Sequence, residues 1–251
     1  MIRAVEKLLT FKPNSLDHGA LVGREHRRFR FGQEFALELD GVWLPQASNV
    51  TALFIHGNRH NLTKFGEHYD LFRQLGISCL AFDFPGYGNS PGTPSEPALY
   101  ASARAAYAWL RHERQVIPSS IIIYGCSLGG AVALELAQNY EAACLITESA
   151  FTNSHDMAKH LYPFLPIQRV LPKRFENDSK IGKVRIPHLL IHGERDSLVP
   201  VCMARALYEL AAEPKQLIVV PEAAHTDTLV VGGQRLAREI GVFIGHSTKL
   251  L

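Results

Sequence analysis

The chain has 251 residues, of which 47% are hydrophobic and 20% are charged, and its formal net charge is +2. These values are typical of a soluble globular protein, and they exclude a disordered or fibrous chain. The length fits one domain, so we expect residues 1–251 to form a single unit. The near balance of charges argues against nucleic acid as a partner, and we interpret the basic stretch Arg24–Arg30 as a solvated face.

The N-terminal segment, MIRAVEKLLTFKPNS, lacks the pattern of a targeting or membrane-spanning segment. Its apolar stretch is short and is interrupted by charged residues, whereas a spanning helix needs about 20 consecutive apolar residues. We therefore expect no integral membrane segment, and we expect apolar residues such as Leu8 and Phe11 to pack on the domain.

The rest of the chain alternates short apolar runs with longer helical patterns. Segments 29–31 and 34–38 alternate apolar and polar residues, which predicts an antiparallel edge. The later runs are nearly continuous in Ile, Val, Leu and Phe, as is typical of strands buried on both faces of a parallel sheet. They are Val50–Ile55, Ile77–Phe82, Ile121–Tyr124, Ala143–Thr147, His188–Ile191 and Gln216–Val220.

Helical patterns lie between and after these runs. They are Glu96–Glu113 with Ser95 as its cap, Leu128–Tyr140, Val201–Ala212 and Gln234–Ile244. Repeated strand and helix predict an α/β fold, with a mostly parallel, doubly wound sheet of about eight strands flanked by helices. Ligands of such sheets lie beyond the carboxyl ends of the strands, so those ends are where a site is expected.

A serine follows one of these strands at a sharp turn. The run Ile121–Tyr124 continues as Gly125-Cys126-Ser127-Leu128-Gly129-Gly130 and then as a helix. This is the strand, turn and helix context of the GxSxG nucleophile elbow. The glycines let strand and helix approach closely, a strained backbone exposes the serine hydroxyl, and the helix N-terminus favours negative charge nearby. We therefore predict that Ser127 is a nucleophile.

A serine hydroxyl needs a base, and the base is in turn oriented by an acid. Among the 12 histidines, His225 is the best placed, because it follows the last predicted strand. In hydrolases with this elbow the acid lies between serine and histidine in the chain. Asp196, just beyond the preceding strand, meets that condition. Glu194 on the same loop and Glu148 at the end of an earlier strand remain alternatives.

The negative charge that develops during acyl transfer needs two hydrogen-bond donors. One is the backbone N–H of the residue after the nucleophile, here Leu128. The other is expected on the loop after Val50–Ile55, which reads His56-Gly57-Asn58, so we predict the Asn58 N–H as the second donor of the oxyanion hole. Losing one such donor typically costs about 3–4 kcal/mol of transition-state stabilisation.

Motifs for metals and nucleotide cofactors are missing from the sequence. There is no HExxH, Cys/His quartet, GxGxxG or P-loop, so no metal and no cofactor are expected. We interpret His56 and His192, which precede glycines at strand ends, as structural hydrogen-bonding residues. Cys126 stands beside the nucleophile, but an elbow points this neighbour away from the substrate, so we expect it to pack in the core.

The four cysteines indicate a reducing compartment. Cys79, Cys126, Cys144 and Cys202 form no CxxC pair, and three of them have apolar surroundings. This pattern is typical of reduced, mostly buried thiols, which predicts a cytoplasmic protein.

Together these motifs resemble the α/β-hydrolase superfamily. The segments that carry the resemblance are HGN at 56–58, FDFPGYGNSPGTPSE at 82–96, YGCSLGGA at 124–131, IHGERD at 191–196, and the late His225. More narrowly, they resemble the BEM46-like branch, with relatives in the ABHD13 and ABHD17 groups. The resemblance implies that Ser127, Asp196 and His225 form a triad and that Asn58 and Leu128 form the oxyanion hole. Many members of this branch attach to membranes through a spanning helix or cysteine cluster, neither of which is expected here.

The segment 151–185 stands where larger hydrolases insert a cap domain. It is short enough to form only a flap, and its apolar residues either line an acyl pocket or cover the core. We therefore expect a serine hydrolase that cleaves carboxylic esters or thioesters of small to medium acyl groups. A peptidase or amidase with the same triad is the alternative among enzymes. A pseudo-hydrolase that binds without turnover and an adaptor that docks through the N-terminal segment are the alternatives outside them.

Overall fold

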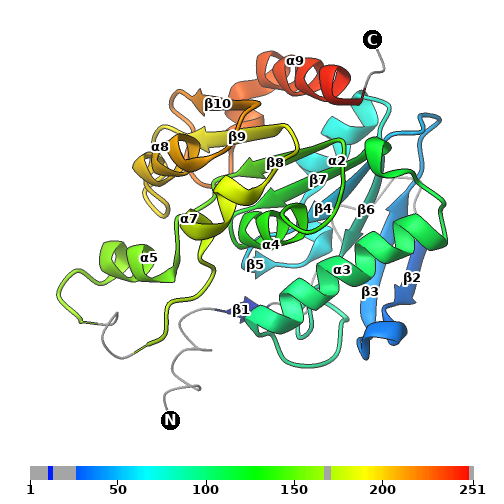
Figure 1. Cartoon of the computed structure of the whole chain (residues 1–251), viewed down its shortest axis with the longest axis horizontal. Helices are drawn as coiled ribbons and strands as arrows, with labels where there is room; N and C mark the ends of the chain where they lie inside the picture. The colour runs from blue at the N-terminus through cyan, green and yellow to red at the C-terminus, as the bar shows by residue number, and fades with distance from the viewer. Residues whose placement is uncertain (1–10, 14–26, 167–170, 249–251) are drawn as a thin grey trace.

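The computed structural model describes residues 11–13, 27–166 and 171–248 (Figure 1). Its centre is an eight-stranded sheet in the order β10-β9-β8-β7-β4-β6-β3-β2, which confirms the predicted fold class. Neighbours from β10 to β6 are parallel, whereas β3 is antiparallel to both β6 and β2. The strands are β2 (Arg27–Phe31), β3 (Leu39–Leu44), β4 (Thr51–Ile55), β6 (Ser78–Phe82), β7 (Ile121–Cys126), β8 (Cys144–Glu148), β9 (His188–Gly193) and β10 (Lys215–Val220). A separate parallel pair joins β1 (Lys12–Pro13) and β5 (Arg59–His60).

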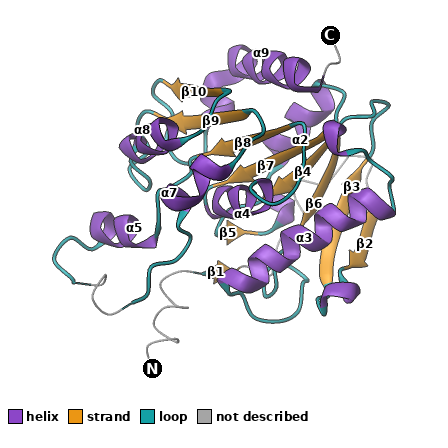
Figure 2. Cartoon of the chain, viewed as in Figure 1, coloured by secondary structure: helices purple, strands orange, loops and turns teal. Residues whose placement is uncertain are grey.

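Helices cover both faces of the sheet (Figure 2). On one face lie α3 (Glu96–His112), α4 (Leu128–Ala137) and α8 (Val201–Leu210), and on the other lie α2 (Gly66–Gln74) and α9 (Thr228–Thr248). The strands between these helices contribute side chains to the core on both faces of the sheet. In β4, for example, Leu53 and Ile55 pack beneath α3 and α4, while Ala52 and Phe54 pack beneath α2 and α9. This two-sided burial explains why these strands read as continuous apolar runs.

The remaining helical segments among the described residues are short. They are α5 (Ser154–Leu161), α7 (Asn177–Lys180) and the 3₁₀ turns Gln33–Phe35, Leu62–Lys64, Pro118–Ser120 and Ile181–Lys183. The long helix α3 begins as predicted, because the Ser95 side chain accepts a hydrogen bond from the Ala98 N–H (3.3 Å). The helix α9 contains a break at Gly233, where φ is 51°.

The predicted edge pair is wrong in one of its strands. β2 forms as expected, but its partner is β3 rather than residues 34–38. Residues 33–35 form a 3₁₀ turn bounded by Gly32 and Ala36, both of which have positive φ values (94° and 54°). The strand was hidden because Asp40 and Gly41 interrupt the apolar pattern of β3. Asp40 is nevertheless buried, and its N–H donates to Ser90 Oγ (2.8 Å).

Part of the N-terminal expectations falls outside the described residues, including Leu8 and positions 24–26 of the basic stretch. Phe11 packs on the domain, with its ring 6.4 Å from that of Phe175. Arg30, at the end of the basic stretch, is exposed and pairs with Glu38. In the part of the chain that the structure describes, we find no helix with the length and apolar character needed to cross a bilayer. All four cysteines carry free thiols, three of them buried and Cys202 exposed.

Candidate active site

Ser127 lies in a strained turn between β7 and α4. Its φ and ψ are 52° and −114°, a conformation that side chains other than glycine rarely adopt. The turn is tight because glycine stands on both sides of it. A Cβ on Gly125 would collide with the Gly129 carbonyl, and a Cβ on Gly129 would collide with the carbonyl of Ile55 at the end of β4. The elbow predicted from GxSxG is therefore held between two neighbouring strands.

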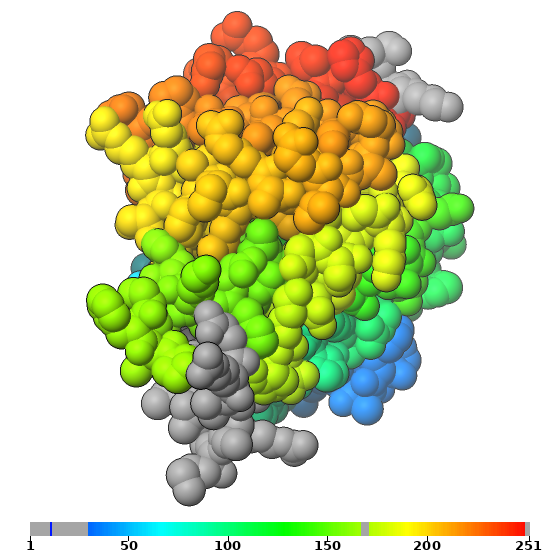
Figure 3. Space-filling model, turned by 60° about the vertical axis from the view of Figure 1, so that its left-hand side comes forward, coloured from blue at the N-terminus to red at the C-terminus, as the bar shows by residue number. Residues whose placement is uncertain are grey.

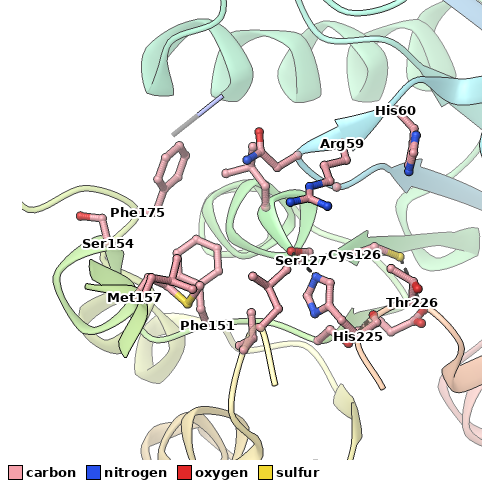
Figure 4. A pocket seen from close by; sticks show the side chains of 18 of the residues that line it. Arg59, His60, Cys126, Ser127, Phe151, Ser154, Met157, Phe175, His225 and Thr226 are labelled. Atoms are coloured by element: carbon pink, nitrogen blue, oxygen red, sulfur yellow. Dashed lines mark hydrogen bonds between the residues drawn. The ribbon is translucent and has the colours of Figure 1, made fainter. Parts of the chain in front are cut away.

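The imidazole of His225 connects the hydroxyl of Ser127 to the carboxylate of Asp196. Figure 4 shows His225 beside Ser127. Its Nε2 lies 3.1 Å from Ser127 Oγ, which can donate to it. Its Nδ1–H donates to Asp196 Oδ2 at 2.7 Å. The three residues come from the carboxyl ends of β7, β10 and β9, which the parallel sheet brings to one edge. This order of contacts is the geometry that activates a serine hydroxyl.

Asp196 is buried and fully engaged. Its Oδ1 accepts from the N–H groups of Leu198 (3.0 Å) and Val199 (2.8 Å), and its Oδ2 also lies 3.3 Å from His192 Nε2. Burial by itself would raise the pKa of Asp196. The hydrogen bonds from His192, His225 and the Val199 N–H outweigh burial and hold the pKa below its ordinary value. Asp196 is therefore ionised at neutral pH and can fix the orientation of His225.

The two alternative acids lie elsewhere. Glu194 is exposed on the turn that carries Asp196. Glu148 is buried, but its carboxylate accepts from His68 Nε2 (2.8 Å), from the Tyr124 hydroxyl (2.7 Å) and from the Thr228 hydroxyl. Burial would raise the pKa of Glu148, yet His68 and these hydroxyls lower it to about 2. Of the three candidates, the described contacts bring Asp196 to the imidazole of His225.

The loop after β4 passes directly beside the nucleophile. A Cβ on Gly57 would lie 3.5 Å from the Cβ of Ser127, so the backbone of this loop is adjacent to the elbow. The next residue, Asn58, lines the same pocket, and its side chain is held by the Tyr87 hydroxyl (2.8 Å). Leu128 is the first residue of α4, where backbone N–H groups have no acceptor within the helix. The positions of Asn58 and Leu128 thus suit two donors aimed at one point above Ser127.

The two histidines expected to be structural have buried, specific partners. His56 Nδ1–H donates to the Gly57 carbonyl (2.7 Å), and burial lowers the pKa of His56 to about 4. His192 Nε2–H donates to the Val199 carbonyl (2.7 Å) and lies beside Asp196. Its role thus extends to the loop that holds the candidate acid, which the sequence did not indicate.

A cavity of about 630 Å³ opens above Ser127. On one side it is lined by apolar residues of the flap and the loop after β9, namely Phe151, Met157, Leu161, Tyr162, Leu171, Phe175 and Leu198. On the other side it is lined by Arg59, His60 and Lys64, all exposed. Figure 4 shows Met157 and Phe151 on the opposite side of Ser127 from His60. The cavity therefore has one mostly apolar half and one polar half, in which the acid Glu67 also lies.

Within the flap, α5 contributes to the apolar half without burying any residue, whereas Phe151 and Phe175 belong to the core. None of the eight described residues of α5 is buried, although Met157 and Leu161 line the cavity. The Ser154 N–H donates to the Arg174 carbonyl (3.0 Å), and the Arg174 N–H donates to Ser154 Oγ (2.7 Å). The segment around Ser154 and the segment around Arg174 form a continuous surface, green and yellow in Figure 3. The apolar flap residues that were expected to line an acyl pocket fall into two groups. Some line the cavity, whereas Phe164 is 95% exposed and Leu165 also faces outward.

Several residues around the site escaped the sequence analysis. His68 and Thr228 are each 80 residues from Glu148 in the chain and meet it only through the fold. No local motif marks either of them. Arg59, in contrast, follows Asn58 directly and could have been found by extending the loop by one residue.

The buried carboxylate of Glu148 should make stability depend on pH in acid. Its pKa is about 2 in the folded protein and 4.5 ordinarily, so its contribution is fully present above about pH 4.5 and is lost as the pH falls through about 2. Glu148→Gln should therefore lower the free energy of unfolding by about 3 kcal/mol at pH 7, since it replaces the buried carboxylate that accepts hydrogen bonds from His68, Tyr124 and Thr228. Thermal melts of wild type and variant between pH 7 and pH 2 should converge in acid.

Glu38→Gln, which breaks an exposed pair, should change stability by less than about 1 kcal/mol. Equal losses in both variants at pH 7 would contradict this reading.

Comparisons with known proteins agree with this architecture. A family profile described as "Alpha/beta hydrolase family" matches residues 52–181. The uncharacterised protein MT2364 of Mycobacterium tuberculosis is 36% identical over 217 residues, which cover 85% of this chain and 77% of that protein. Human alpha/beta hydrolase domain-containing protein 17B is 34% identical over 190 residues, covering 74% of this chain and 63% of the relative. The solved structure of the Pyrococcus furiosus esterase PF2001 superposes with a TM-score of 0.81 and 20% identity, over 95% of this chain and 98% of the other.

Proposed function

Because the chain belongs to the alpha/beta hydrolase family, with relatives in its ABHD branch, we propose that it is a serine hydrolase that cleaves carboxylic esters or thioesters of small to medium acyl groups. The observation that carries this proposal is the imidazole of His225, hydrogen-bonded to Ser127 Oγ on one side (3.1 Å) and to Asp196 on the other (2.7 Å). A nucleophile bonded to one nitrogen of a histidine and a buried carboxylate bonded to the other are the contacts expected of a catalytic base.

The proposed reaction follows from these contacts. His225 takes the proton of Ser127 as the hydroxyl oxygen attacks the substrate carbonyl, and Asp196 holds the imidazole in the tautomer with hydrogen on Nδ1. The backbone N–H groups of Asn58 and Leu128 stabilise the oxyanion of the tetrahedral intermediate. The alcohol or thiol leaves with a proton from His225, and an acyl ester of Ser127 remains. Water, deprotonated by His225, then releases the carboxylic acid.

The two halves of the cavity suggest how a substrate lies. The apolar half under the flap suits the acyl chain, because burying each methylene there contributes about 0.8 kcal/mol. The other half leads past Arg59 towards solvent and suits the leaving alcohol or thiol.

A substrate panel tests the proposal. p-Nitrophenyl esters and CoA thioesters of increasing acyl length should be hydrolysed, and a fluorophosphonate probe should label the protein. A panel of peptide amides run beside them distinguishes an amidase with the same triad. Neither turnover nor labelling under conditions in which the protein is folded would indicate a binding module and would contradict the proposal.

Filling the apolar half should shorten the preferred acyl chain. Met157→Trp introduces a larger side chain on the cavity side of α5, where none of the described residues is buried, so the fold should tolerate it. We expect kcat/KM for an octanoyl ester to fall about 10-fold or more, since a few methylenes lose their place at about 1 kcal/mol each, while that for an acetyl ester changes little. Phe164→Trp, on the exposed part of the flap, is the matched control. An equal fall for both esters would mean that the acyl chain lies elsewhere.

A further inference from the structure

Beneath the elbow lies a second cluster of reactive side chains that the proposed mechanism does not use. His68 from α2, Cys126 from β7 and Glu148 from β8 are all buried, and each points one potential metal ligand at the others. The three ligand atoms lie within 4.8 Å of one another. We propose that His68, Cys126 and Glu148 form a binding site for a zinc ion directly behind the nucleophile.

The spacing of the three atoms is close to that of a zinc coordination shell. The distance from Cys126 Sγ to His68 Nε2 is 3.3 Å, from Cys126 Sγ to Glu148 Oε2 3.5 Å, and from His68 Nε2 to Glu148 Oε2 2.8 Å. Ordinary zinc bond lengths and tetrahedral angles place sulfur, nitrogen and oxygen ligands about 3.3–3.6 Å apart. On the same geometry the His68–Glu148 pair must separate by about 0.5 Å and the Cys126–His68 pair by about 0.2 Å.

The carboxylate of the cluster is held in place by further hydrogen bonds. The Thr228 hydroxyl donates to Glu148 Oε1, and the Tyr124 hydroxyl donates to Oε2. Partners of this kind orient metal ligands and strengthen metal sites. On His68, the buried Nδ1 has no hydrogen-bond partner among the described residues. When Nε2 binds a metal as a neutral imidazole, the ring proton moves to this free nitrogen.

The cluster is reachable and leaves one coordination position open. His68, Cys126 and Glu148 all line the cavity that contains Ser127, so an ion can enter from solvent by the path that substrate takes. Three protein ligands leave the fourth position of a tetrahedral ion for water. A thiolate and an imidazole select zinc and similar thiophilic ions over Mg²⁺ and Ca²⁺.

Charge and proton balance favour a divalent ion at this point. On binding, the S–H bond breaks, a Zn–S bond forms and the proton leaves to solvent. The thiolate and the carboxylate together then neutralise the two charges of the ion, as burial in a protein interior requires. Because a proton is released, binding should tighten as the pH rises.

Occupation of this site should inhibit the proposed hydrolysis. Cys126 precedes Ser127 directly, and the Ser127 N–H donates to the Glu148 carbonyl (2.8 Å). A metal bound by Cys126 and Glu148 therefore constrains the elbow. The ion also adds positive charge near His225, which must become an imidazolium in the transition state. This consequence rests on the proposed function, whereas the binding site does not.

Titration of the metal-free full chain with Co²⁺ and Zn²⁺ tests the site. The Cys202→Ser variant serves as the parent, because it removes the exposed thiol that could bind metal independently. We expect one Co²⁺ per chain with a thiolate-to-metal charge-transfer band, displaced by one equivalent of Zn²⁺. Further substitution of Cys126 by Ser, or of His68 by Gln, should weaken binding at least 10-fold and, for Cys126→Ser, abolish the band. Thermal melts show whether each variant is folded. The charge-transfer band of the parent protein tests the site even if a variant does not fold.

The outcomes separate the site from the hydrolase proposal. No charge-transfer band and no stoichiometric uptake at millimolar Zn²⁺ would overturn the site, and so would a band that persists in folded Cys126→Ser. Zn²⁺ should inhibit ester hydrolysis by the parent at least 10-fold, reversibly with EDTA. Metal binding by a chain that hydrolyses nothing would preserve the site and defeat the proposed function, and hydrolysis without metal binding would do the reverse.

Discussion

Replacing Ser127 by alanine should lower kcat for ester hydrolysis by about 10⁶-fold, because removal of the nucleophile leaves only the oxyanion donors and substrate binding. Covalent labelling by a fluorophosphonate should disappear as well. The fold should survive, since the change removes one oxygen whose hydrogen bond is to His225. Stopped-flow or steady-state assays with an activated ester, together with gel-based labelling, measure both effects.

The control for this variant lies in the same cavity. Ser154 also lines it, but its hydroxyl accepts from the Arg174 N–H and lies at the start of α5 rather than at the elbow. Ser154→Ala should retain labelling and most activity. Labelling that persists in Ser127→Ala would mean that another nucleophile reacts, with neighbouring Cys126 the first to examine.

Replacing Asp196 by asparagine should reduce the rate of acylation by about 10⁴-fold while leaving the backbone in place. The reason is the tautomer of His225. An amide in place of the carboxylate can turn its NH₂ group towards Nδ1, which moves the ring hydrogen to Nε2 and prevents that nitrogen from taking the Ser127 proton. Pre-steady-state burst kinetics with a p-nitrophenyl ester isolate this step.

Glu148→Gln is the matched comparison, because it makes the same chemical change in the other buried carboxylate of the site. Its contacts are with His68, Tyr124 and Thr228 rather than His225, so acylation measured well below its melting temperature should change little. The reversed result, a large loss in Glu148→Gln and a small one in Asp196→Asn, would assign the acid to Glu148.

The sequence predicts the sheet well wherever a strand is buried on both faces. The runs that become β4, β6, β7, β8 and β9 are visible because every residue in them is buried. The edge strand β10 buries only Ile218 and Val220 of its six residues, but its apolar run still marks it. The residues at their carboxyl ends could then be assembled from chain order alone, since parallel strands bring those ends together. Ser127, His225 and Asp196 do lie within hydrogen-bonding distance in the structure.

The features that the sequence did not reveal have a common physical cause. They depend on contacts between residues that lie far apart in the chain. β3 was missed because its polar Asp40 is accommodated by a loop 50 residues away, through Ser90. The network of His68 with Glu148 depends on the packing of α2 against the sheet, and a single histidine on a short helix carries no local signal of it. The division of the flap between cavity-lining and exposed residues likewise depends on where the backbone turns.

The helix α5 provides side chains to the cavity yet buries none of its described residues in the core. Selection can therefore act on it with little effect on the free energy of unfolding, since surface changes usually alter stability by less than about 0.5 kcal/mol. Substrate preference in this protein can consequently diverge through this one segment while the sheet and its strand ends stay unchanged. Exchanging residues 154–161 between homologues is thus a direct route to new acyl specificities.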